Sequence, residues 1–176
     1  MERTPAARRE TSLSALGKLD IGTPEQRLRA LGLELPVLSE PRGNYTRVRR
    51  HGSLLYLAGH GPAPDAGGRR PSGKVGASLT LEEGYDAARS AGLGLLATLA
   101  VELGDLSRVT AVLRVFGMVN VAPGFVATPS VIDGCSDLFI KVFGPDVGTH
   151  ARSAIGVAEL PYDLPVEIEA IVAVRD

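Results

Sequence analysis

The chain has 176 residues, of which 44% are hydrophobic and 22% charged, and its formal net charge at pH 7 is -1. These values are typical of a soluble globular domain and give the whole chain no general affinity for nucleic acid. The single cysteine, Cys135, cannot form an internal disulfide, and no apolar run is long enough to span a bilayer. We therefore expect a cytoplasmic protein with no membrane partner.

The N-terminal residues 1–20 are charged, show little periodicity and lack the apolar region of a secretory signal. We expect a solvated tail or extension there. The length that remains suits one domain over residues 21–176. Within it we expect a helix and loop in residues 21–43 and the core in residues 44–176.

The first predicted helix begins at Thr23, where Thr can cap, Pro24 suits the first helical position and Gln26 has capping-box spacing. An apolar stripe that starts at Leu28 continues to Leu35, and the following proline ends the element.

A β-hairpin is predicted next. Residues 45–50 alternate in polarity, residues 53–58 are rich in Leu and Tyr, and His51-Gly52 forms a tight turn between them. Residues 59–76 are rich in Gly, Pro and Arg without periodicity, and such long loops tend to be functional or mobile.

A long helix is predicted from Thr80, which has capping-box spacing to Glu83, to about Leu103, where Gly104 provides a C-terminal cap. A third strand over residues 108–119 and a second helix over residues 130–143 follow.

Two apolar strands are predicted in the last quarter, over residues 151–157 and 166–172, joined as a hairpin by a turn that contains Pro161. The element order ββαβαββ predicts a two-layer α+β fold, with two helices on one face of a mixed sheet. Both faces of the last strand are largely apolar, so the uncovered face requires a partner surface.

These strands carry charged groups that are costly on an apolar sheet unless they are partnered. Arg152 opens one strand, and arginine holds a carboxylate through two parallel hydrogen bonds. Glu167 and Glu169 share a face of the other strand, so each disfavours ionisation of its neighbour. The pattern indicates a site for a small carboxylate with a glutamate for proton transfer. An intersubunit or surface salt bridge for Arg152, and a solvated face or ion pairs with Arg47 and Arg49 for the glutamates, are the alternatives.

The segments "ARSAIGVAELP" and "PVEIEAIVAV" together resemble the C-terminal signature of the RidA/YjgF family, the reactive-intermediate deaminases once described as endoribonucleases. The hairpin segment "LLYLAGHGP" resembles the family's "FxSGQxP", and "GKVG" with the helix after it resembles the family's first helix. The resemblance runs from about Asn44 to the C-terminus. It implies the chorismate-mutase-like fold, a homotrimer and no cofactor.

The resemblance also implies site residues. Arg152 corresponds to the arginine that binds the substrate carboxylate, and Glu167 to the glutamate that orients or activates water. Tyr45 corresponds to a tyrosine that closes the pocket, and Gly59 to a glycine whose backbone approaches the ligand. Both could instead be core residues next to a turn. The family's helix asparagine has no clear counterpart, and Ser136 or Asp133 stands nearest; we take Ser136 as the substrate-binding candidate.

The chain departs from the family pattern at two positions beside Gly59, where Ala58 replaces serine and His60 replaces glutamine. His60 could titrate near neutrality, or be merely exposed. A regular final hairpin would also place Glu167 roughly 20 Å from Arg152. We therefore expect these two residues to meet across a subunit boundary or through a strong bend.

The leading hypothesis is hydrolytic deamination of small imines or enamines that carry a carboxylate, such as 2-aminoacrylate, to 2-keto acids and ammonia. The ligand would lie at subunit interfaces. A trimer that binds small carboxylates without catalysis is the alternative, and an endoribonuclease is the third candidate. The three histidines lack metal-ligand spacing, so no metal is expected. Cys135 is expected to be a buried hydrophobe rather than a nucleophile.

Overall fold

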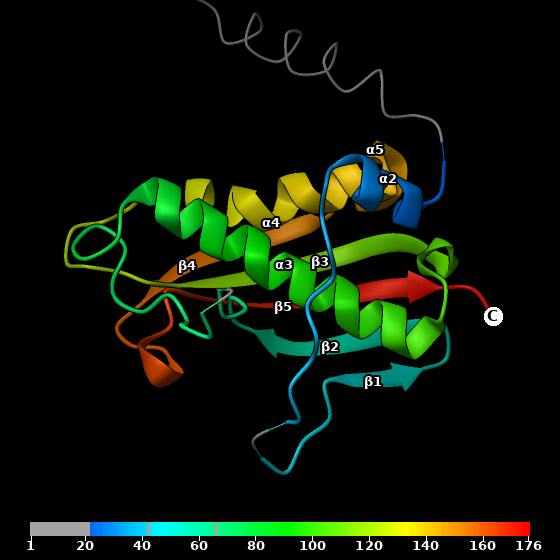
Figure 1. The fold of residues 1–176 in the computed structure, drawn as a ribbon, viewed down its shortest axis with the longest axis horizontal. Helices are drawn as coiled ribbons and strands as arrows, with labels where there is room; N and C mark the ends of the chain where they lie inside the picture. Colours follow the sequence, from blue (N-terminus) through cyan, green and yellow to red (C-terminus); the bar gives the residue numbers. More distant parts are fainter. Residues whose placement is uncertain (1–21, 42, 66) are drawn as a thin grey trace, which may run out of the picture.

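The computed structural model describes residues 22–41, 43–65 and 67–176. The expected tail, residues 1–20, lies outside the described residues. A five-stranded sheet is covered on one face by the two long helices (Figure 1). The strands are β1 (Val48–His51), β2 (Leu54–His60), β3 (Val109–Asn120), β4 (Ala151–Val157) and β5 (Val166–Val174), and the helices are α2 (Pro24–Ala30), α3 (Leu81–Leu103), α4 (Thr128–Phe143) and α5 (Pro145–Gly148). The two-layer α+β prediction is confirmed.

Local signals set the start of α2 and both ends of α3 as predicted. Both capping boxes form, between Thr23 and Gln26 at α2 and between Thr80 and Glu83 at α3. Gly104 ends α3 in the left-handed conformation, with φ 74°. No helix within the described ranges is long and apolar enough to cross a membrane.

The first helix is shorter than expected. It ends at Ala30, because Gly32 adopts φ 65° and turns the chain out of the helix. The chain then runs without regular structure across α3 towards β1 (Figure 1). Leu35, expected on a helical stripe, packs against the core from this segment, as does Leu33.

The prediction that the last two strands form a hairpin is wrong. The strand order is β1-β2-β5-β3-β4, so β3 lies between β4 and β5. The connection through α4 returns β4 parallel to β3, whereas β5 is antiparallel to β3. The turn after β4 instead passes the end of β3, where the Asn120 N–H donates to the Pro165 carbonyl and the Asn120 side chain donates to Asp163.

The core lies between the sheet and the two long helices. Glycines bring α3 and α4 close together: a Cβ on Gly134 would lie 2.1 Å from the Tyr85 carbonyl oxygen, and one on Gly92 would lie 3.1 Å from the sulfur of Cys135. Cys135 is fully buried, and burial raises the pKa of its thiol to about 12. It is therefore a packing residue, as expected.

The other face of the sheet is not covered within the described chain. Tyr56, Leu113 and Ile155 are exposed large hydrophobic residues on strands β2, β3 and β4. Both edge strands, β1 and β4, pair on one side only. An open apolar face and unpaired edges are features that soluble proteins usually cover.

Candidate functional site

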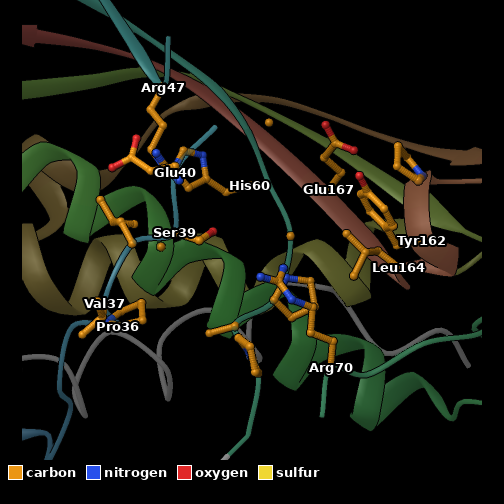
Figure 2. A pocket seen from close by; sticks show the side chains of 18 of the residues that line it. Pro36, Val37, Ser39, Glu40, Arg47, His60, Arg70, Tyr162, Leu164 and Glu167 are labelled. Atoms are coloured by element: carbon orange, nitrogen blue, oxygen red, sulfur yellow. The ribbon is translucent and has the colours of Figure 1, made fainter. Parts of the chain in front are cut away.

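A cavity of about 470 Å³ lies where β2 ends (Figure 2). Three segments form its walls: residues 36–40 before β1, the end of β2 with the loop after it, and residues 161–167 leading into β5. This volume is typical of sites for small molecules.

Glu167 and Gly59 meet in this cavity. Glu167 lies on β5, on the face opposite the helices, and its side chain crosses over Gly59 of the neighbouring strand. A Cβ on Gly59 would lie only 2.0 Å from Glu167 Oε1, so the carboxylate occupies the space that a side chain would fill. The β2–β5 register shifts between Leu57 and His60, and such irregularities often redirect side chains beside active sites.

The environment of Glu167 favours its protonated form. Burial of the half-buried carboxyl raises its pKa above the ordinary value of 4.5, and the negative charge of Glu169 raises it further. The expected ion pairs between these glutamates and Arg47 or Arg49 do not form within the described residues. Glu167 is therefore an unpartnered carboxyl in a cavity, with a pKa shifted towards neutrality.

Tyr45 also lines the cavity, at its open side, with 57% of its surface exposed. Two arginines line it as well: Arg47, which the sequence suggested only as an ion-pair partner of the glutamates, and Arg70, which it did not single out. Within the described residues neither side chain forms a hydrogen bond or an ion pair.

His60 is buried rather than exposed. Its Nδ1 lies 2.7 Å from the Ala58 carbonyl oxygen and its Nε2 lies 2.7 Å from Thr98 Oγ. Because a carbonyl only accepts, Nδ1 carries the proton, and Nε2 accepts from the Thr98 hydroxyl. Burial lowers the pKa of His60, and the nearby Arg47 lowers it further. His60 is therefore a neutral wall of the cavity that joins β2 to α3.

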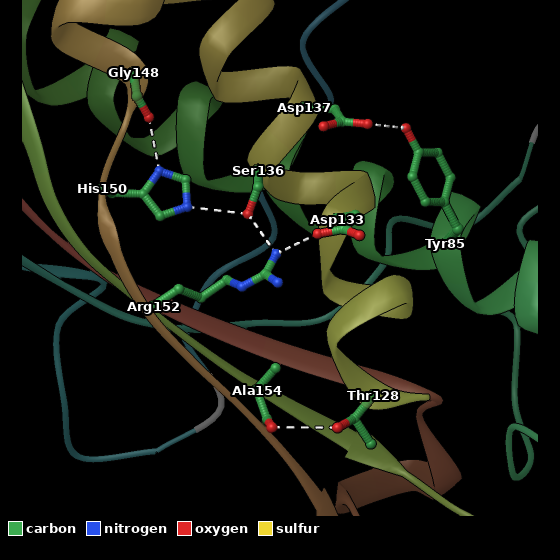
Figure 3. Close-up of polar contacts among 9 residues, drawn as sticks. All are labelled: Tyr85, Thr128, Asp133, Ser136, Asp137, Gly148, His150, Arg152 and Ala154. Carbon is green, nitrogen blue, oxygen red and sulfur yellow. Dashed lines mark hydrogen bonds and ion pairs between the residues drawn. The ribbon is translucent and has the colours of Figure 1, made fainter. Parts of the chain in front are cut away.

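Arg152 lies in a separate polar cluster between β4 and α4 (Figure 3). Its Nη1 is 2.7 Å from Asp133 Oδ1 and 2.9 Å from Ser136 Oγ. Ser136 Oγ is 3.0 Å from His150 Nε2, and His150 Nδ1 donates to the Gly148 carbonyl at 2.7 Å. The Ser136 hydroxyl therefore donates to His150 and accepts from Arg152.

Arg152 and Glu167 do not meet in one chain. Arg152 of β4 pairs with Val115 of β3, and its side chain faces α4. Glu167 of β5 pairs with Met118 on the other side of β3, and its side chain faces the open side of the sheet. Two strand spacings and three residues along the sheet separate their Cα atoms by about 14 Å. The two residues are thus closer than the roughly 20 Å predicted from a hairpin, and it is strand β3 that separates them.

The predicted site residues thus divide into two groups. Tyr45, Gly59 and Glu167 line the cavity, whereas Arg152 and Ser136 do not. Asp133 and Ser136 were the two candidates for the position of the family's helix asparagine, and both contact Arg152. Within the described parts of the chain, no group of three or more His, Cys, Asp and Glu is placed to hold a metal ion.

Comparison with known proteins identifies the family. The family described as "YjgF/chorismate_mutase-like, putative endoribonuclease" matches residues 25–165. The chain belongs to this family. Protein TCP17 of Trypanosoma cruzi is 41% identical over 149 residues, which are 85% of this chain and 92% of that protein.

Solved structures of YjgF-family proteins agree with this assignment. Protein Atu1372 of Agrobacterium tumefaciens, of unknown function, is 37% identical to this chain and superposes on it with a TM-score of 0.79. The match covers 87% of this chain and 94% of the Atu1372 chain. A protein of Shewanella oneidensis named as a putative endoribonuclease is 34% identical with a TM-score of 0.82, covering 87% of this chain and 100% of its own.

Proposed function

We propose that this YjgF-family protein hydrolyses small imines and enamines that carry a carboxylate, giving 2-keto acids and ammonia. The observation that carries the proposal is the placement of Glu167: a half-buried carboxyl with a raised pKa, lying over a glycine in a small-molecule cavity. Because its pKa is raised, this carboxyl returns a proton less readily than an ordinary glutamate but accepts one more readily, as a general base requires.

The reaction needs only water and a proton carrier. An enamine such as 2-aminoacrylate first becomes its protonated imine by taking a proton from solvent at the methylene carbon. The ionised Glu167 then removes a proton from water as its oxygen bonds to the C=N carbon. The protonated Glu167 passes that proton to the amine nitrogen, which becomes –NH3+. The hydroxyl then gives its proton to Glu167 as the C–N bond breaks, which releases the 2-keto acid and ammonia, and ammonia takes this proton from Glu167 and leaves as ammonium. Acid-base help of this kind accelerates reactions on the order of 10²–10⁴-fold.

The substrate carboxylate requires a cation, and we propose that Arg152 of a neighbouring copy supplies it. Arg152 lies on edge strand β4, whose outer side is unpaired, and only one of its terminal nitrogens contacts Asp133 and Ser136. The apolar open face of the sheet favours assembly of several copies. A cytoplasmic homotrimer with ligands at its interfaces would cover the open apolar face and bring Arg152 of one copy to the cavity of another.

Complementation between variants tests this arrangement. We co-express Arg152→Ala and Glu167→Gln chains, each inactive alone, and follow keto acid release from 2-aminoacrylate generated in the assay. If each site combines residues from two copies, about a quarter of the sites in an equal mixture are intact and activity returns to that extent. The control is co-expression of Glu167→Gln with the Arg152→Ala/Glu167→Gln double variant. This mixture contains no intact Glu167, so it restores no activity. No recovery in the first mixture would exclude a shared site, and no acceleration by wild type would exclude the deaminase.

A trimer that binds small carboxylates without turnover is the second candidate. The ion pair between Arg152 and Asp133 favours binding without turnover, because Asp133 already neutralises the arginine that the substrate carboxylate requires. A ligand-induced rise in melting temperature without catalysis selects this function. The formal net charge of -1 and the size of the cavity do not favour RNA as substrate; RNA binding that weakens with salt would restore that candidate.

A further inference from the structure

Two arginines line the cavity in addition to the residues that the proposed reaction uses. Arg47 approaches from the segment before β1, and Arg70 from the loop after β2 (Figure 2). Neither guanidinium group forms an ion pair or hydrogen bond in the described parts of the chain. Unpartnered guanidinium groups that converge on one cavity are suited to bind an anion.

The position of the arginines separates them from the reacting centre. Figure 2 shows Arg47 with His60 on one side of the cavity, Arg70 on another, and Glu167 with Tyr162 and Leu164 on a third. The α-carboxylate is assigned above to Arg152 of a neighbouring copy, so Arg47 and Arg70 remain available for a different group of the ligand.

The size of the cavity agrees with a longer ligand. Its volume of about 470 Å³ lies within the roughly 300–1,000 Å³ found for sites that hold drug-sized molecules. A three-carbon imine would fill only a small part of it. The mobile end of a longer side chain would reach the walls formed by residues 36–40 and Arg70.

We propose that the preferred substrates are imino acids whose side chain carries a second carboxylate, which Arg70 and Arg47 bind from the two sides of the cavity away from Glu167. This inference rests on the proposed deaminase activity for its reaction, but the second binding position can be measured without turnover. One carboxylate, Glu40, also lines the cavity without pairing with either arginine, so it opposes the second anion and reduces its affinity.

A matched pair of substrates tests the proposal. The imines of glutamate and norvaline, generated in the assay by an amino acid oxidase, have the same carbon chain and differ in the terminal carboxylate. We expect kcat/KM to be about 10- to 100-fold higher for the glutamate imine, the range given by charge-assisted hydrogen bonds. Arg70→Gln removes this preference, because it lowers kcat/KM for the glutamate imine far more than for the norvaline imine. Arg69→Gln is the control, because Arg69 adjoins Arg70 but does not line the cavity.

Binding of stable products separates this inference from the proposed activity. Calorimetric titration compares 2-oxoglutarate with 2-oxovalerate on wild type and on both variants, after thermal melts show that each variant is folded. Tighter binding of 2-oxoglutarate that depends on Arg70, without acceleration of either imine, supports the second anion position and overturns the deaminase. Equal binding of the two acids, or equal losses in Arg69→Gln and Arg70→Gln, overturns the inference even where imines are hydrolysed.

Discussion

The two polar regions of this protein differ in how well their charged groups are satisfied. In the cluster at α4, Arg152, Ser136 and His150 form a continuous hydrogen-bonded chain that ends on a backbone carbonyl. In the cavity at β2, Glu167 and the nearby arginines have no such partners within the described residues. A satisfied network fixes a side chain in position, whereas an unsatisfied group is available for a ligand. We therefore expect the first region to hold Arg152 in position for a ligand and the second to carry out the proposed proton transfer.

The largest expected effect tests the chemistry of the cavity. Replacing Glu167 with Gln keeps the shape of the side chain but removes its proton transfer. We expect kcat for 2-aminoacrylate hydrolysis to fall on the order of 10²–10⁴-fold. Glu169→Gln, two residues along the same face and outside the cavity, is the control and should cost far less. Equal losses in the two variants would remove the distinction between the glutamates.

The next effect tests why the cavity contains a glycine. Gly59→Ala places a methyl group where Glu167 Oε1 now lies, 2.0 Å from the new Cβ, so the carboxylate must move. We expect at least about a 10²-fold loss of kcat, the scale of a 1 Å misplacement. A double-mutant cycle with Glu167→Gln measures the cause. If displacement of Glu167 is responsible, Gly59→Ala costs little in the Glu167→Gln background, and additive losses contradict this explanation.

A smaller effect tests the α4 cluster. Asp133→Asn keeps a hydrogen-bond acceptor for Arg152 but removes the negative charge beside it. The side chains are 22% exposed for Arg152 and 48% exposed for Asp133, so the pair is solvent-screened and contributes about 1 kcal/mol or less to the free energy of unfolding. Without the competing charge, carboxylate ligands should bind more tightly. Chemical denaturation and titration with pyruvate measure the two effects, and unchanged affinity would mean that Asp133 does not compete.

The smallest effect is in the pH dependence of stability. The pKa of Glu167 is raised in the folded protein by burial and by Glu169, so its protonated form favours folding. That contribution is fully present below the unfolded pKa near 4.5 and is lost as pH rises through the higher folded pKa. Glu167→Gln should therefore be more stable than wild type at pH 7 but not at pH 4. Denaturation of both proteins across this range checks the sign, and a constant difference would contradict the shifted pKa.

Local sequence signals predicted the helices better than the sheet. The caps at Thr23, Thr80 and Gly104 depend on a few neighbouring residues, and each is observed. The pairing of β4 depends on where α4 returns the chain, which no short segment specifies, so the interpretation of Pro161 as a hairpin turn was wrong.

The candidate site was predictable in part for the same reason. The family resemblance selected Tyr45, Gly59 and Glu167, and the structure brings them together. Arg70 was missed, because a loop without periodicity does not reveal which of its side chains faces a cavity. Its location in the 59–76 segment, expected to be functional, was the only available signal.

The strand between Arg152 and Glu167 has a consequence for how the protein would work in dilute solution. Because β3 lies between them in every chain, an isolated copy cannot bring both groups to one ligand. Specific turnover should then fall when the protein is diluted below the concentration at which its copies associate, so that assembly acts as an on-off control of catalysis.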